Sequence, residues 1–104
     1  MDKGKKLDIE VLTGPLDGHV ITIEDKAEWT CLAGGLLAFP WDTELGQPQS
    51  WFMVEEEDWL IEPISSSHGT YIFNREMKLS EKTVLQKGDI LKASKTWIMI
   101  KDMS

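Results

Sequence analysis

The stretch from Ser65 to Thr70 (SSSHGT) is the richest segment of the chain in side chains that can bind or react. Three serines, a histidine and a glycine lie there between two apolar segments. Hydroxyl groups and loop N–H groups can together form a concave site for an anionic or acceptor-bearing ligand. The alternative is a solvated turn in which the serines bond their own backbone. Composition alone favours the solvated turn. The binding loop is the more specific hypothesis, because it predicts a ligand.

A catalytic centre is not expected. The histidines His19 and His68 and the single cysteine, Cys31, do not have the spacing of metal ligands. Ser67 and His68 are neighbours in sequence, whereas a nucleophile and its base must converge in space beside an orienting carboxylate. Cys31 lies in an expected strand, where a small buried side chain is the usual role. The sequence therefore predicts a protein that is not an enzyme and needs no metal or cofactor.

The charge balance limits the kinds of partner. Eighteen acidic and 11 basic residues give a net charge of −7. Nucleic acid and direct membrane contact are therefore not expected, because both depend on clustered Lys and Arg. The sequence shows no signal peptide and no apolar run of about 20 residues, and one cysteine fits a reducing compartment. A cytoplasmic location is expected. The acidic run from Glu55 to Asp58 is expected to be a solvated hairpin tip rather than a metal or partner site.

The remaining pattern is one of short strands separated by turns. Ile9 and Val11 alternate with Asp8 and Glu10, which is typical of a half-buried strand, and the turn GPLDG follows. At 104 residues the chain is expected to be one domain. Runs rich in β-branched and aromatic residues predict eleven strands and no helix, at 7–13, 19–24, 29–33, 36–39, 50–55, 59–62, 70–73, 76–78, 83–85, 90–94 and 96–101. This succession indicates an all-β sandwich or barrel.

Five tryptophans are many for this length. Four of them lie in predicted strands and are expected to fill the core, each with a partner for its indole N–H. Trp41 instead lies in the polar stretch Pro40–Ser50. It is either an exposed anchor for a protein partner or a side chain that folds back to plug the loop. The plug is the favoured alternative.

The order of these features resembles the forkhead-associated (FHA) domain over essentially the whole chain. That family typically reads Gly-Pro-Leu-x-Gly, then Trp-x-Leu-x-Asp-Leu-x-Ser-x-Asn-Gly-Thr, then Leu-x-x-Gly-Asp. The positions in register are Trp59, Ile61, Ser66, Ser67, Gly69 and Thr70 in the central motif, and Leu85, Gly88, Asp89 and Ile90 in the later one. The resemblance implies an eleven-stranded antiparallel β-sandwich, with residues 1–6 as a flexible N-terminus and 7–102 as a single FHA-like domain.

The resemblance also implies a binding end, because FHA domains usually bind phosphothreonine peptides through loops at one end of the sandwich. Family binders carry an Arg after the third strand, and Ala33 stands at the matching position. No Lys or Arg occurs between Lys26 and Arg75, and the spacing of a strand places Arg75 roughly 16 Å from the serine loop. A phosphothreonine is held best by the fork of an arginine, so the usual phosphate grip is not expected here.

The other family positions depart as well. Binders carry Ser-x-x-His near the fifth strand, and the matching positions here are Pro48 and Trp51. Ser67 does match a peptide-contacting position. The Asn that follows in the family is His68 here, which lacks the paired donor and acceptor of an amide.

The sequence therefore predicts a divergent FHA domain that acts as a phosphorylation-independent protein-interaction or scaffolding domain, of the kind found in bacterial secretion and signalling assemblies. One alternative is weak, salt-sensitive binding of a phosphothreonine peptide through Ser66, Ser67, His68 and Lys95. Another is a packing module that self-associates through an apolar patch. The expected contact residues are Ser66, Ser67, His68, Ala33, Gly34, Gly35, Trp41 and Lys95.

Overall fold

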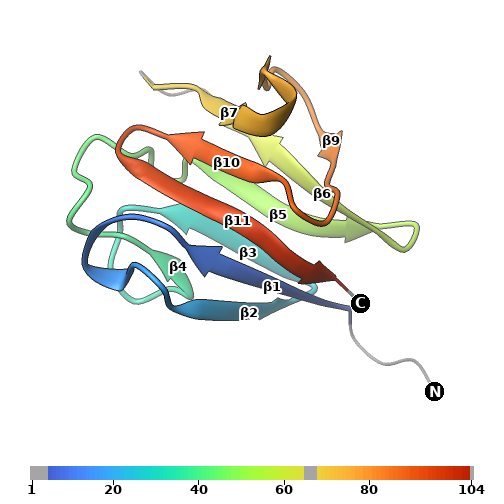
Figure 1. The fold of residues 1–104 in the computed structure, drawn as a ribbon, viewed down its shortest axis with the longest axis horizontal. Helices are drawn as coiled ribbons and strands as arrows, with labels where there is room; N and C mark the ends of the chain where they lie inside the picture. The colour runs from blue at the N-terminus through green and yellow to red at the C-terminus, as the bar shows by residue number, and fades with distance from the viewer. Residues whose placement is uncertain (1–4, 65–67, 104) are drawn as a thin grey trace.

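The fold is a sandwich of two β-sheets, seen in a computed structural model that describes residues 5–64 and 68–103. The sheets face one another in Figure 1. The six-stranded sheet has the order β2-β1-β11-β10-β7-β8, and the five-stranded sheet has the order β4-β3-β5-β6-β9. The predicted eleven-stranded β-sandwich is therefore confirmed.

The strand ends lie mostly within two residues of the predicted ones. The six-stranded sheet contains β1 (Lys6–Val11), β2 (Val20–Glu24), β7 (Thr70–Ile72), β8 (Met77–Lys78), β10 (Ile90–Ala93) and β11 (Thr96–Met103). The five-stranded sheet contains β3 (Lys26–Thr30), β4 (Leu37–Ala38), β5 (Ser50–Glu55), β6 (Asp58–Pro63) and β9 (Thr83–Val84). Two single turns of 3₁₀-helix are η1 (Gly14–Leu16) and η2 (Phe73–Arg75). No helix in the described part of the chain is long and apolar enough to span a membrane.

Strand β3 differs most from the prediction. It begins at Lys26 because its charged first residues pair with β5, starting with Lys26 opposite Met53. It ends at Thr30, so Cys31 lies in the following bend and is half-buried rather than part of a strand. After the loop β4 runs alongside β3 in the same direction, so this one pair is parallel within an otherwise antiparallel fold.

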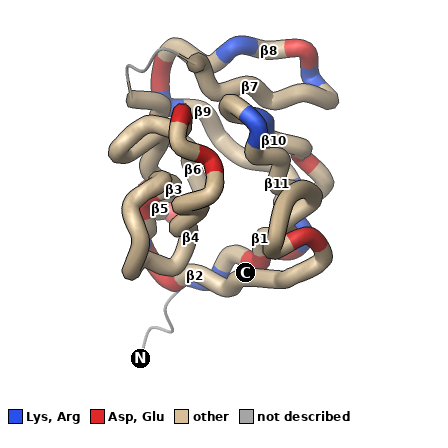
Figure 2. The backbone as a smooth tube through the Cα atoms, turned by 90° about the vertical axis from the view of Figure 1, so that its left-hand side faces the viewer, with Lys and Arg blue, Asp and Glu red and all other residues tan. Residues whose placement is uncertain are grey.

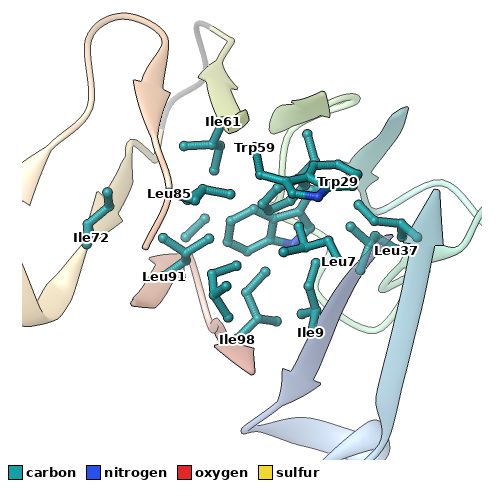
Figure 3. Packing of buried hydrophobic residues seen from close by; sticks show 14 of the residues in the cluster. Leu7, Ile9, Trp29, Leu37, Trp59, Ile61, Ile72, Leu85, Leu91 and Ile98 are labelled. Atoms are coloured by element: carbon teal, nitrogen blue, oxygen red, sulfur yellow. The ribbon is translucent and has the colours of Figure 1, made fainter. Parts of the chain in front are cut away.

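The core lies between the sheets, where alternate residues of the strands point inward (Figure 3). The indole rings of Trp29 and Trp59 lie at its centre, surrounded by aliphatic side chains such as Leu7 and Ile98. Both indole N–H groups are buried without a hydrogen-bond partner among the described residues, contrary to the expectation that each would have one. An unpaired buried donor costs roughly 1–3 kcal/mol, which the large buried ring area offsets.

The acidic tip of the β5–β6 hairpin is solvated, as expected. Glu56 and Glu57 are exposed and have φ values of 51° and 73°, the left-handed backbone of a two-residue type I′ turn. No group of His, Cys, Asp and Glu in the described ranges is placed to hold a metal ion.

The chain's single arginine is used structurally. Arg75 follows β7 in η2, and its guanidinium forks onto Asp89, with 3.1 Å from Nε to Oδ1 and 2.5 Å from Nη2 to Oδ2. A third bond runs from Nη2 to the carbonyl of Val84 at 3.1 Å. The Asp89 carboxylate is buried and also accepts the backbone N–H of Gln86 at 2.8 Å. Arg75 therefore holds the turn before β10 in place through these hydrogen bonds.

Candidate functional site

Several loops gather at one end of the sandwich, on the left of Figure 1 and opposite the C-terminus. We call this surface the loop end. It comprises the β3–β4 loop (31–36), the β4–β5 loop (39–49), the β10–β11 turn (94–95) and the described residues 64 and 68–69 between β6 and β7. The β4–β5 loop is its hub, because it is hydrogen-bonded to the other three segments.

Asp42 ties the hub to the β10–β11 turn. Its buried carboxylate accepts bonds from Ser94 Oγ at 2.8 Å, the backbone N–H of Lys95 at 2.9 Å and Thr96 Oγ1 at 2.7 Å. Burial raises the pKa of Asp42, but the hydrogen bonds from these groups and from the backbone of Glu44 lower it by more. The net pKa lies below its ordinary value of 3.8, so the carboxylate is ionised near neutral pH.

Gln49 ties the hub to the segment that follows the serines. Its side chain is fully buried, and Nε2 donates to the carbonyl of His68 at 2.6 Å and to Thr70 Oγ1 at 3.0 Å. Ser50 Oγ lies 2.8 Å from the same Thr70 hydroxyl. The side-chain oxygen of Gln49 accepts the backbone N–H of Gly46 at 2.7 Å, which closes its own loop. One amide therefore holds two loops at a fixed separation.

Glu44 and His68 meet above this buried network. The Oε1 atom of Glu44 lies 3.0 Å from Nε2 of His68, and both side chains are largely exposed. The pair joins the β4–β5 loop to the predicted recognition loop. It also places a carboxylate directly on the imidazole that stands in for the family's Asn.

The β3–β4 loop presents apolar surface where family binders carry an arginine. Ala33, Gly34 and Gly35 are all exposed, and Gly34 has a φ of +106°, which only glycine adopts readily. They are flanked by Leu32 and Leu36, whose exposed fractions are 49% and 61%. The described part of this loop therefore offers leucine side chains rather than a cation.

Trp41 occupies the position of a plug. It is half-buried and packs on the core cluster. Its ring lies so close over Gly14 that a methyl group added there would approach the indole carbon Cζ2 to 2.3 Å. Its indole N–H is buried without a partner among the described residues. This placement matches the favoured alternative, in which Trp41 locks the β4–β5 loop onto the β1–β2 turn.

The remaining predicted positions are spread over the molecule. Lys95 is exposed at the β10–β11 turn, within the loop end. Ser66 and Ser67 lie outside the described residues. Trp51, the position matched to the family's His, is on the outer face of β5 with Lys26 Nζ 4.6 Å from its ring centre. The buried residue that links the loops is instead Gln49, two positions earlier.

The structure thus adds residues that sequence reasoning did not identify. They are Leu32, Leu36, Asp42, Glu44 and Gln49. A polar residue such as Asp42 or Gln49 gives no periodic signal inside an irregular loop, since its partners are distant in sequence. The two exposed leucines were visible as apolar residues beside Gly34 and Gly35, but the predicted strands 29–33 and 36–39 assigned them to strands.

Comparisons with known proteins agree with this architecture. Residues 49–94 match the family model of the FHA domain. No curated protein matches the chain. The FHA domain of a hypothetical protein from Arabidopsis thaliana has a similar structure, with a TM-score of 0.84 and 19% identity over 100% of this chain and 93% of that chain.

Two further solved structures share the fold. One comes from a structural and functional analysis of phosphothreonine-dependent FHA domain interactions, with a TM-score of 0.75 and 14% identity over 96% of this chain and 97% of that chain. The other is the FhaA FHA domain complexed with the intracellular domain of Rv3910, with a TM-score of 0.76 and 14% identity over 91% and 99% of the two chains. Residues 49–94 therefore match the FHA family model, and the whole chain has the fold of the solved FHA domains.

Proposed function

We propose that this domain is a non-enzymatic scaffold that binds a protein partner at the loop end without requiring a phosphate group. The observation that carries the proposal is the Glu44 carboxylate, which lies 3.0 Å from the imidazole of His68. A phosphate entering beside His68 would meet a negative charge. Elsewhere on the loop end, Ala33 stands at the position where family binders carry an arginine. It lies between two exposed leucines.

Lys95 does not replace the missing arginine. A phosphate dianion about 6 Å from the Glu44 carboxylate is repelled by roughly 5 kcal/mol at an effective dielectric of about 20, before screening by salt. A single ammonium group at the same distance contributes an attraction of the same size. Lys95 would therefore offset Glu44 rather than hold the phosphate, and it offers no bidentate fork.

Leu32 and Leu36 supply the favourable contact instead. Burying an exposed leucine side chain under a partner contributes about 1.5–3 kcal/mol when burial is complete, and these two are already partly covered. Interfaces commonly concentrate their binding energy in a few such central side chains. An extended partner segment with apolar residues would fit this surface better than a phosphorylated one.

One of the solved structures supports a protein partner. The FhaA FHA domain is complexed with the intracellular domain of another protein, which supports a protein partner here. A cytoplasmic location, in a bacterial secretion or signalling assembly, is part of the proposal.

The proposal is tested with a displayed library of random, unphosphorylated peptides selected on the wild-type domain. Synthetic versions of the selected peptides are then measured by calorimetry against two variants. Leu36→Asp is expected to weaken binding at least about tenfold, because it places a charge in the proposed contact. Val20→Asp is the matched control, since Val20 is similarly exposed at 47% but lies on β2. Peptides that bind both variants alike, or that bind only after threonine phosphorylation, would contradict the proposal.

A further inference from the structure

The outer face of the six-stranded sheet carries a lysine between two aromatic rings. Lys92 on β10 is directly opposite Tyr71 on β7 and Trp97 on β11. Its Nζ atom lies 5.8 Å from the centre of each ring. Directly opposed residues of neighbouring strands have side chains in contact, so the three form one continuous surface. A cation over two ring faces is held in place by cation–π attraction.

A second lysine approaches the same surface. Lys78 on β8 lies with Nζ 6.0 Å from the ring centre of Tyr71. Neither Lys78 nor Lys92 forms an ion pair with a carboxylate of the described residues, whereas Lys82 pairs with Glu55 at 2.6 Å. Figure 2 shows basic positions on β8 and on β10. In a chain of net charge −7, this is a local site of positive charge.

An apolar groove adjoins Lys92. It has a volume of about 500 Å³ and is lined by Tyr71, Ile72, Phe73, Glu76, Met77 and Lys92. Phe73 is 55% exposed and packs edge-on against Trp97, with ring centres 4.8 Å apart. Exposed aromatic and methionine side chains around a concave surface are typical of protein interaction sites. We call this surface the Lys92 groove.

We propose that the Lys92 groove is a second docking site, for a protein segment in which acidic side chains flank a bulky apolar one. The apolar side chain would enter between Phe73 and Met77, and a carboxylate would meet the ammonium groups of Lys92 and Lys78. Glu76 on the rim disfavours acid on its own side and so orients the segment toward the lysines. The Debye length is about 8 Å at physiological salt, so the distant acids that make up most of the net charge are screened. The groove lies on the face of the sheet, and Lys78 also reaches the loop end, where its side chain lies against Gly69. The proposal goes beyond the function proposed above.

The test is an NMR titration of the labelled domain with two synthetic hexapeptide pools. One pool carries Glu or Asp on both sides of Leu, Phe or Trp, and the other carries Gln or Asn in their place. The acidic pool is expected to give saturable shifts at Tyr71, Met77, Lys92 and the Trp97 indole. Lys92→Gln is expected to weaken this binding at least about tenfold. Lys87→Gln, at a lysine whose side chain is 70% exposed on the far turn, is the matched control and should bind as wild type.

A second variant separates the apolar contribution from the charge. Phe73→Ser changes an exposed side chain and should weaken the acidic pool while the spectrum stays dispersed. Three results would each overturn the proposal: equal binding of the acidic and amide pools, equal loss in the Lys92 and Lys87 variants, or shifts confined to the loop end at Gly34 and His68. The last result would overturn the groove and leave the proposed function of the loop end standing, so failures of the two proposals are distinguishable.

Discussion

Replacing Arg75 with methionine is expected to destabilise the domain by about 3–5 kcal/mol. The substitution removes the guanidinium but keeps much of the side-chain volume, so the Asp89 carboxylate remains buried without its counter-charge. Among the residues that the structure describes, only the backbone N–H of Gln86 and the amide of Asn74 would still bond to it, at 2.8 and 3.3 Å. Leaving a buried charge without its partner costs far more free energy than losing an exposed ion pair.

Urea unfolding followed by circular dichroism measures this effect. Lys87→Met is the control, because its ion pair with Asp102 is long, at 3.8 Å, and exposed. Arg75→Met combined with Asp89→Asn should be less destabilised than the sum of the single variants, since the double variant contains no uncompensated charge. A free energy of unfolding for Arg75→Met within about 1 kcal/mol of wild type would show that the pair is not structural.

The second large effect is expected at Asp42. Asp42→Ala removes the shared acceptor of Ser94, Lys95 and Thr96, and the Thr96 hydroxyl is fully buried. Hydrogen bonds to a charged group contribute about 1.5–3 kcal/mol each and are not additive, so we expect a loss of about 3 kcal/mol. The β10–β11 turn would also lose its attachment to the hub loop. Thermal unfolding checks the loss of stability, and amide exchange checks the turn.

Acid should remove the contribution of Asp42. The folded-state pKa lies below the ordinary value of 3.8, so the stabilisation is present above pH 3.8 and is lost as the pH falls through the folded-state value. The difference in unfolding free energy between wild type and Asp42→Asn should therefore be largest at neutral pH and shrink below pH 3.8. Asp17→Asn is the control, because Asp17 is exposed. A wild-type to Asp42→Asn difference that stays constant across the acid range would contradict the assigned role of the ionised carboxylate.

The sheets could be predicted from sequence because each strand carries its own signal. The run SWFMVE alternates between the inside and the outside of the sandwich, and the predicted strand 50–55 matches β5 at both ends. Turn residues such as Gly14 and Pro15 separate the strands, because their own backbone preferences determine where the chain turns. The predicted strand 29–33 lies later in the sequence than β3, because Lys26 and Glu28 are polar and give no strand signal of their own. Only their pairing with β5 includes them in the sheet.

The loop end could be predicted only in outline. The absence of an arginine near Ala33 is a local fact that the sequence shows directly. The pairing of Glu44 with His68 joins residues from two irregular loops, and no periodic pattern specifies which side chains meet there. The same applies to the surface beside the Lys92 groove, where Tyr71, Lys92 and Trp97 come from β7, β10 and β11 and become neighbours only through strand register.

The central claim is that the loop end does not depend on phosphate, and one NMR titration tests it most directly. The labelled domain is titrated with a degenerate phosphothreonine peptide pool and with its unphosphorylated counterpart. We expect no saturable shift at His68, Gly69 or Thr70 that is specific to the phosphorylated pool. The double variant Ala33→Arg/Glu44→Gln serves as the positive control. It should gain phosphate-dependent shifts at these residues, because it restores a guanidinium and removes the opposing carboxylate. Saturable shifts at His68 to Thr70 of the wild-type domain, with the phosphorylated pool alone, would contradict the account.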